Sequence, residues 1–129
     1  MIMEESHILQ LAAVSRAMAL QGVCPWTNLQ SIDSMLRYIL GECQELADAV
    51  KENKASLEIA SEAGDVLTLV LTLCFLLERE GKLKAEEVFA EAIAKLRRRS
   101  PHVFDPDNQI SLEEAAEYWS RMKEQEKIS

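Results

Sequence analysis

The sequence predicts an all-α protein, a bundle of four main helices with a C-terminal helical arm. Aromatic residues make up only 5% of the chain, and it contains just four Gly and three Pro. This composition favours helices over a sheet. Apolar residues also recur at helical spacing in several long segments. Because 129 residues can bury a sizeable core, we expect residues 1–129 to form a single domain.

The expected helices are bounded by residues that favour helix ends. Ser31 and Ser56 can act as N-caps, and Ser111 begins a capping-box pattern. Gly22 and Gly81 are suitable stops. The segment Cys24-Pro25-Trp26-Thr27 is expected to break the first helix. Later in the chain, Asp105-Pro106-Asp107-Asn108 is a turn-rich linker. The expected helices run from about Glu4 to Gln21, Ser31 to near Asn53, Ser56 to Gly81, Ala85 to Arg99 and Ser111 to about Lys127.

The third helix is apolar almost all round from Val66 to Leu77. One layer of neighbouring helices cannot cover such a surface, so the helix must lie between two layers. In a chain this short, a second copy is the natural source of the other layer. We therefore expect a homodimer or a higher homo-oligomer, with a deep core inside one chain as the alternative.

Two pairs of acidic residues stand out, Glu42 with Glu45 and Glu62 with Asp65. Each pair is spaced i, i+3, which places both carboxylates on one helix face about one turn apart. Four carboxylates brought together would repel each other unless a cation joined them. Mg²⁺ prefers oxygen ligands, so the pattern indicates a magnesium site. The alternative is that each pair lies on a solvated helix face.

The neighbours of these acids argue against a solvated face. Glu45 falls beside Tyr38 and Ala49, and acids at the edge of a core are rarely tolerated unless they are paired or bind a metal. Glu42 borders an apolar arc expected from Met35, Ile39, Cys43, Leu46 and Val50, and Glu62 falls within one formed by Ile59, Val66, Leu69 and Leu73.

A dense positive cluster lies near the end of the fourth helix, where Lys95, Arg98 and Arg99 share one face. These cations could simply complement the helix dipole. They could also hold phosphate oxygens, for which the arginine fork is well suited. On the last helix, Trp119 and Lys123 are one turn apart, and Trp119 is either core filler or a stacking surface. Together with the acids, this is the inventory expected for metal-assisted polyphosphate hydrolysis.

Charge and composition argue against several other functions. A net charge of −8 disfavours a general nucleic-acid binder. Three Cys, without metal-type spacing, fit reduced thiols in the cytoplasm. The N-terminus has no signal-peptide pattern, and the apolar run Val66 to Leu77 is too short to span a bilayer. We therefore expect a cytoplasmic protein with no nucleic-acid or membrane partner.

Taken together, these motifs resemble the MazG family of nucleoside triphosphate pyrophosphohydrolases. The likeness extends in order over most of the chain, from the first long loop to the last helix. The matching segments are Cys24-Pro25-Trp26, Glu42-x-x-Glu45, Ala47-Asp48-Ala49, Glu62-x-Gly64-Asp65, Glu78-x-Glu80-Gly81-Lys82, Lys95-Leu96-Arg97-Arg98-Arg99, Pro101-His102-Val103-Phe104 and Trp119-x-x-Met122-Lys123-x-x-Glu126-Lys127.

The resemblance implies a helical fold that works as a dimer or larger assembly, and hydrolysis of a nucleoside triphosphate to the monophosphate and pyrophosphate. It implies Mg²⁺, with Mn²⁺ as a substitute, held by four acids, and attack of water on the α-phosphorus. Glu42 or Glu45 would accept the proton of the water. The implied metal ligands are Glu42, Glu45, Glu62 and Asp65, and the implied substrate-binding residues are Lys95, Arg98, Arg99, Trp119 and Lys123.

Three positions depart from the family pattern. Gly41 stands where a second acid is common, Thr27 replaces an Asp, and Ser100 replaces a His. The four expected metal ligands are intact, which favours an enzyme that clears excess or non-canonical nucleotides. The alternative is a non-catalytic helical dimerisation module that has kept the fold.

Overall fold

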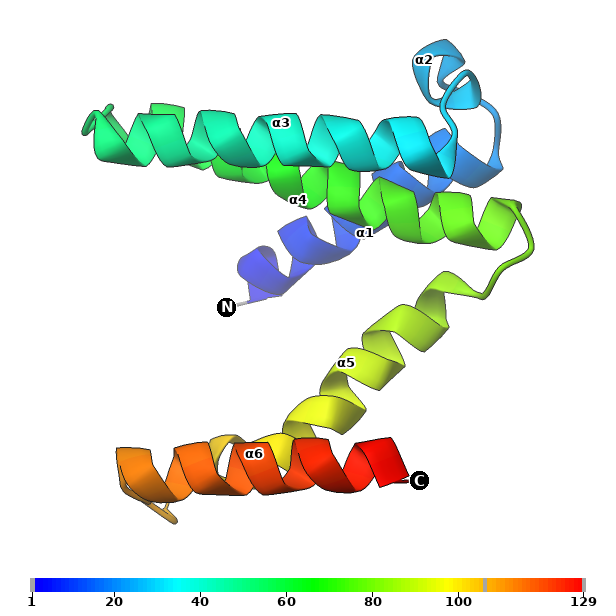
Figure 1. The fold of residues 1–129 in the computed structure, drawn as a ribbon. Helices are drawn as coiled ribbons and strands as arrows, with labels where there is room; N and C mark the ends of the chain where they lie inside the picture. The colour runs from blue at the N-terminus through cyan, green and yellow to red at the C-terminus, as the bar shows by residue number, and fades with distance from the viewer. Residues whose placement is uncertain (1, 106, 129) are drawn as a thin grey trace. The chain divides into compact units, whose positions relative to one another are not determined.

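The computed structural model describes residues 2–105 and 107–128, with side chains from His7 onward. These residues form helices and contain no strand, which confirms the all-α class (Figure 1). Pro106 of the expected linker lies outside the described residues. The elements are α1 (Ile2–Leu20), α2 (Pro25–Asn28), α3 (Ile32–Lys51), α4 (Ser56–Arg79), α5 (Ala85–Arg99), the 3₁₀ helix η1 (Pro101–Phe104) and α6 (Leu112–Ile128).

The chain divides into two compact units, Met1–Ala85 and Glu86–Ser129. The first unit contains α1 to α4. The second contains nearly all of α5, together with η1 and α6. That these units act as one domain over residues 1–129 stays a prediction.

In the first unit, α4 packs against both α3 and α1. The side chains of Met35 on α3 and Leu76 on α4 are fully buried at 0% exposure, so they mark the centre of this core. The Thr68 and Thr72 hydroxyls donate hydrogen bonds to carbonyls one turn back, which satisfies polar groups within an apolar helix.

Part of α4 stays uncovered in the described chain. The side chains of Leu67 and Val70 are 49% and 39% exposed. In length and composition, α4 is long and apolar enough to cross a membrane. The core helix of a soluble protein meets the same criterion. The twelve-residue run Val66 to Leu77 underestimates this helix, because α4 has 24 residues and contains an 18-residue window with no more than two charged side chains. The homo-oligomer and the absence of a membrane partner both stay predictions.

The structure confirms most of the expected helix ends. Ser31 and Ser34 form a reciprocal capping box at the start of α3. Ser111 and Glu114 form another at the start of α6. Gly81 follows α4 with a φ of +76°, a left-handed conformation that glycine adopts without a steric penalty.

Some other local predictions were wrong. Ser56 does not cap α4, because the helix begins at Ser56 itself and Ala55 occupies the N-cap without a side-chain hydrogen bond. The segment at Pro25 does separate the first two long helices as expected, and it forms the short helix α2 there, since proline suits the first helical position. Cys43 is exposed and Val50 is 53% exposed, so both lie outside the buried part of the α3 arc.

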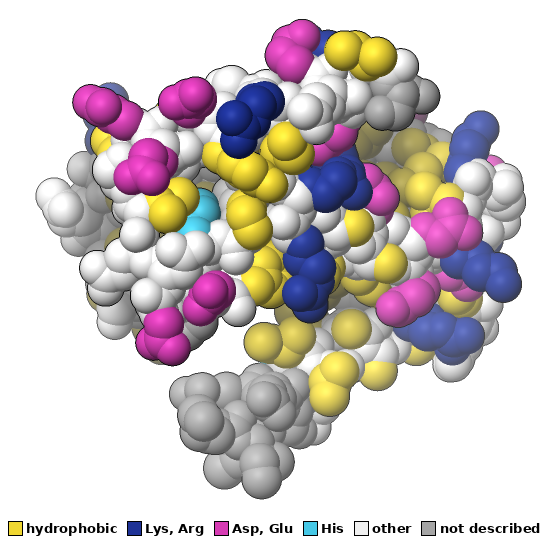
Figure 2. Space-filling view, turned by 90° about the horizontal axis from the view of Figure 1, so that it is seen from below, with side chains coloured by type: hydrophobic (Ala, Val, Ile, Leu, Met, Phe, Trp, Pro, Cys, Tyr) yellow, Lys and Arg dark blue, Asp and Glu magenta, His cyan; other side chains and the backbone are white. Residues whose placement is uncertain are grey.

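In the second unit, the sequence of α5 carries apolar residues at helical spacing, among them Ile93 and Leu96. Ile93 and Leu96 are 48% and 39% exposed, so in the described chain these two side chains lack cover. Figure 2 shows a face of the molecule on which hydrophobic side chains lie open to solvent among charged ones. At the end of α5, the Arg97 guanidinium stacks over the Phe104 ring at 4.2 Å, which fixes η1 against the helix.

Candidate functional site

Three of the four expected metal ligands come together in the first unit. Glu42 on α3 and Glu62 and Asp65 on α4 each offer a carboxylate oxygen, and these oxygens lie within 4.8 Å of one another. The packing of α4 on α3 therefore joins two acidic pairs that are separate in the sequence. Glu45, the fourth acid, lies beside Glu42 and shares a hydrogen bond with it.

The environment of this acid cluster is unfavourable to negative charge. The hydrogen bond with Glu45 raises the pKa of Glu42, and desolvation and repulsion from Glu45, Asp65 and Glu62 add to the effect. Desolvation raises the pKa of Glu62, with further repulsion from Glu45 and Asp65. No cation of the described chain pairs with these carboxylates.

The donor atoms fit a hard divalent cation. Oε2 of Glu42 and Oε2 of Glu62 are buried and have no hydrogen-bond partner. Buried acceptors without partners are costly, and a cation that prefers oxygen ligands would satisfy them. The acid cluster can therefore hold a metal, and Asp65, which is exposed, would supply an oxygen on the open side.

An open cavity of about 500 Å³ adjoins the acid cluster along α3. We call it the α3 cavity. The residues of its wall recur at helical spacing, so they share one face, and this face includes the acidic pair Glu42 and Glu45. Sequence reasoning singled out only the acids, although the same spacing links them to polar residues up to three turns earlier. The lining residues are Gln30, Ser34, Arg37, Tyr38, Gly41, Glu42 and Glu45.

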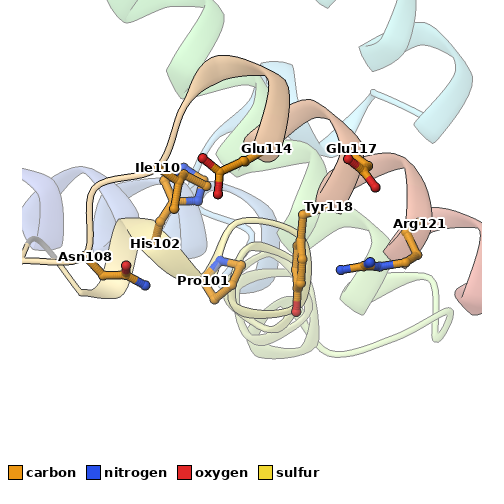
Figure 3. A pocket seen from close by; sticks show the side chains of 8 residues that line it. All are labelled: Pro101, His102, Asn108, Ile110, Glu114, Glu117, Tyr118 and Arg121. Atoms are coloured by element: carbon orange, nitrogen blue, oxygen red, sulfur yellow. The ribbon is translucent and has the colours of Figure 1, made fainter.

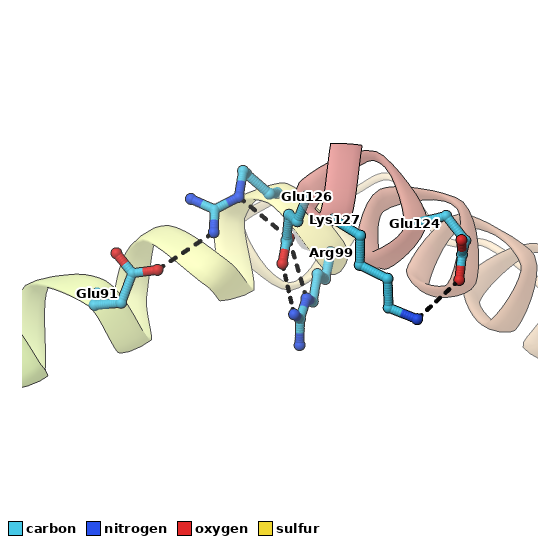
Figure 4. A network of polar contacts seen from close by, with 6 residues as sticks. Glu91, Arg99, Glu124, Glu126 and Lys127 are labelled. Atoms are coloured by element: carbon cyan, nitrogen blue, oxygen red, sulfur yellow. Dashed lines mark hydrogen bonds and ion pairs between the residues drawn. The ribbon is translucent and has the colours of Figure 1, made fainter. Parts of the chain in front are cut away.

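The second unit contains the predicted basic cluster, where Glu126 of α6 pairs with two of the arginines (Figure 4). Arg99 donates through Nη2 to Oε1 at 2.6 Å and through Nε to Oε2 at 3.2 Å, a bidentate arrangement. Arg98 donates through Nε to Oε2 of the same carboxylate at 3.3 Å. Its Nη2 lies 3.4 Å from Glu91 Oε1.

These contacts strongly favour the charged form of the carboxylate. The hydrogen bonds from Arg99, and then those from Arg98, lower the pKa of Glu126 to about 2. Glu126 in turn raises the pKa of Arg99. Local spacing could not identify Glu126 as the partner, because it lies 27 residues beyond Arg99 and reaches it only once α6 returns along α5.

The remaining predicted substrate-binding residues lie near this pair. The Arg99 guanidinium lies over the Trp119 ring at 5.1 Å, and Trp119 is 38% exposed. Lys95 is exposed and has no ion pair within the described residues, and Lys123 is also exposed. Lys95 and Arg98 line a cavity of about 470 Å³ together with Glu91, Met122, Gln125 and Glu126.

Another cavity of the second unit, of about 320 Å³, lies between η1 and α6 (Figure 3). It mixes both signs of charge, and the Arg121 guanidinium lies 5.2 Å from the Tyr118 ring. None of its residues belongs to the sites predicted from the sequence. The lining residues are Pro101, His102, Asn108, Ile110, Glu114, Glu117, Tyr118 and Arg121.

Comparisons with known proteins agree with the acidic motif and the helical fold. The chain is 31% identical over 127 residues to the nucleoside triphosphate pyrophosphohydrolase/pyrophosphatase MazG of Thermotoga maritima, covering 97% of this chain and 48% of that protein. It is 37% identical over 105 residues to a nucleoside triphosphate pyrophosphohydrolase of Mycolicibacterium smegmatis, covering 80% of this chain and 32% of that protein. The chain thus spans half or less of these curated relatives.

Similarity of fold points to the same family as similarity of sequence. The crystal structure of a mazG-related protein from Thermotoga maritima superposes with a TM-score of 0.78 at 29% identity, covering 89% of this chain and 97% of that one. Residues 30–104, which include both acidic pairs, match the family described as MazG nucleotide pyrophosphohydrolase domain. The chain therefore belongs to the MazG family.

Proposed function

We propose that the protein is a Mg²⁺-dependent nucleoside triphosphate pyrophosphohydrolase, with Mn²⁺ as a substitute metal. The observation that carries this proposal is the acid cluster, in which buried oxygens of Glu42 and Glu62 lack partners and lie close to Asp65. The names of its relatives support the same reaction class. The substrates would be ribo- or deoxyribonucleoside triphosphates, including non-canonical ones.

In this proposal, Glu42, Glu45, Glu62 and Asp65 hold the metal. Bound Mg²⁺ would supply Lewis-acid stabilisation of the phosphates and lower the pKa of a coordinated water. Glu42 or Glu45 accepts the proton of the attacking water. The water oxygen forms a bond to the α-phosphorus as the bond to the bridging oxygen of the β-phosphate breaks, and pyrophosphate leaves. The products are a nucleoside monophosphate and pyrophosphate.

The second unit would contribute to nucleotide binding through Lys95, Arg98, Arg99, Trp119 and Lys123. Lys95 is the most accessible donor of the basic cluster, because it has no ion pair among the described residues. Arg98 and Arg99 are already paired with Glu126. Trp119 offers an aromatic surface on which a base could stack, with Arg99 lying over its ring.

The exposed apolar residues of α4 and α5 support assembly as at least a homodimer. Light scattering at micromolar concentration should give a mass of at least twice 14.6 kDa. A monomer would contradict this part of the proposal. An oligomer held by an apolar interface should also melt at a temperature that rises with protein concentration.

The second candidate is a non-catalytic helical dimerisation module. One observation favours it: Glu126 occupies the two arginines expected to hold phosphate. The unpaired oxygens of the acid cluster favour the enzyme, since a purely structural module gains nothing from them.

A panel of nucleoside triphosphates incubated with Mg²⁺ would test the activity, provided that monophosphate, diphosphate, pyrophosphate and orthophosphate are resolved. We expect monophosphate and pyrophosphate in equal amounts, and none after EDTA treatment. Orthophosphate and diphosphate as main products would refute the proposed reaction, and no turnover across the panel would favour the module.

A further inference from the structure

The α3 cavity contains one cationic side chain, Arg37, among its described lining residues. The cavity also holds Glu42 and Glu45, so Arg37 shares it with two of the four acids proposed to bind the metal. Lys95, Arg98 and Arg99 belong to the other compact unit. Arg37 is thus the cation that the first unit itself places in a cavity with these acids.

The wall around Arg37 is held in place by contacts within the first unit. Ser34 Oγ donates to Gln30 Oε1 at 2.7 Å, and Gln30 Nε2 donates to the Trp26 carbonyl at 3.1 Å. The Arg79 guanidinium donates to the Gln30 carbonyl at 2.9 Å. The Tyr38 ring also meets the Trp26 ring edge to face, with the ring centroids 5.2 Å apart. The cavity therefore needs little rearrangement to receive a ligand.

Arg37 is weakly engaged. Its Nη1 pairs with Asp33 Oδ2 at 3.0 Å, one turn away on α3, and the two side chains are 72% and 79% exposed. Exposed pairs at this spacing contribute little stability. This single contact leaves other guanidinium donors of Arg37 available, in contrast to Arg99, whose fork is filled by Glu126. A polyphosphate held next to Arg37 would be a stronger, bidentate partner than Asp33.

Gly41 leaves open space at the wall of the α3 cavity. It lines the cavity, and a Cβ built there would meet no atom within 4 Å. The position therefore tolerates a side chain, and a charged side chain there would lie in the cavity. This makes Gly41 a place where occupancy of the cavity can be tested without disturbing the core.

We propose that the α3 cavity is a phosphate subsite. In it, Arg37 releases Asp33 and binds the β- and γ-phosphates of the substrate, and then the pyrophosphate product. Gly41 keeps the subsite open. The inference rests on the proposed function for the identity of the ligand, but phosphate binding can be measured without turnover.

The test is calorimetric titration of the intact protein with pyrophosphate in the presence of Mg²⁺. Arg37→Gln should weaken pyrophosphate binding by about tenfold or more, since it removes charge-assisted hydrogen bonds. It should leave the melting temperature and Mn²⁺ binding in the absence of pyrophosphate unchanged. Asp33→Asn, which releases Arg37, should bind pyrophosphate at least as tightly as the wild type.

Gly41 provides a matched pair of variants. Gly41→Ala removes a helix-interior glycine and should raise stability while pyrophosphate binding stays unchanged. Gly41→Glu introduces the acid that is common at this position in the family. It should also fold, but in this chain it adds an anion to the cavity that contains Arg37 and should weaken pyrophosphate binding by about tenfold, as loss of Arg37 does. Equal binding by the two variants would overturn the role of Gly41.

The outcomes separate this inference from the proposed function. Wild-type pyrophosphate affinity in Arg37→Gln, or no measurable affinity in the wild type, would refute the subsite even if triphosphates are hydrolysed. Binding that depends on Arg37, in a protein that turns over no triphosphate, would support the subsite and refute the enzyme.

Discussion

The two clusters of charge in this protein treat the same chemical group in opposite ways. In the first unit, Glu42 and Glu62 lie among other acids, and their pKa values are raised. In the second unit, Glu126 lies against Arg98 and Arg99, and its pKa is lowered to about 2. The comparison shows which cluster is complete by itself. Glu126, Arg98 and Arg99 form a cluster, the Glu126 cluster, in which the carboxylate already has its cations. The acid cluster has no cationic partner among the described residues, and we infer that a metal ion is the missing partner.

The largest expected effect comes from removing the metal ligands. Glu42→Ala, Glu45→Ala, Glu62→Ala and Asp65→Ala should each lower kcat/KM by about 100-fold or more, because each removes a group that holds the metal or accepts a proton. Each variant should stay folded, since it removes one anion from a repulsive cluster.

Asp48→Ala is the matched control, because Asp48 is an exposed acid on α3 that accepts a hydrogen bond from Gln44 Nε2. It should keep near-wild-type activity. Melts in EDTA in which all four cluster variants are clearly less stable than the wild type would show that these acids are structural partners instead.

Trp119 tests whether the Glu126 cluster serves binding or only packing. Loss of a stacked aromatic costs roughly 1–3 kcal/mol, by analogy with bases stacked on proteins. Trp119→Ala should therefore raise KM by about 5- to 150-fold and largely preserve kcat. Steady-state kinetics together with a thermal melt would check this.

The Arg99 guanidinium carbon lies 5.1 Å from the centroid of the Trp119 ring. If Trp119 only supports Arg99, the Trp119→Ala variant would melt at a lower temperature and its KM would be unchanged. Glu126→Gln is a useful companion variant, since it weakens the hold on Arg99 without altering the aromatic ring.

The pH dependence of stability should separate the two clusters by sign. An acid with a raised native pKa destabilises the metal-free fold at neutral pH, so stability should rise as the pH falls through the raised pKa of Glu42 and Glu62. Glu126 acts in the other direction. Its stabilisation is present above its unfolded pKa and is lost as the pH falls from about 4.5 towards about 2.

Melting temperatures in EDTA between pH 7 and pH 2.5 would test both signs. The wild type should pass through a maximum. Glu62→Gln should reduce the rise on the neutral side, and Glu126→Gln should reduce the fall on the acid side. A curve that neither substitution alters would mean that these two clusters do not govern stability.

The sequence was most informative where structure depends on local spacing. The capping boxes at Ser31 and Ser111 and the glycine after α4 correctly indicated helix ends, because caps involve residues three or four positions apart. The spacing of Glu42 and Glu62 relative to apolar neighbours correctly indicated partly buried acids. Ser56 failed as a cap because a helix can also begin at a serine, as α4 does.

Features that depend on the return of the chain could not be found in this way. Glu126 meets Arg99 across 27 residues, and nothing near Arg99 in the sequence indicates this partner. The hydrogen bond from Arg79 to the Gln30 carbonyl, beside the α3 cavity, likewise spans 49 residues. The lining of the cavity does follow helical spacing, so Arg37 and Tyr38 could have been noted as neighbours of the acids.

Direct measurement of metal binding tests the central claim, that the acid cluster lacks a divalent cation which Mg²⁺ or Mn²⁺ supplies. Calorimetric or electron paramagnetic resonance titration with Mn²⁺ should show saturable binding to the wild type and to Glu126→Gln. It should show binding at least tenfold weaker to Glu62→Gln, which keeps the size of the side chain but removes a charged ligand. Equal Mn²⁺ binding by Glu62→Gln and the wild type, or none by the wild type, would contradict the account.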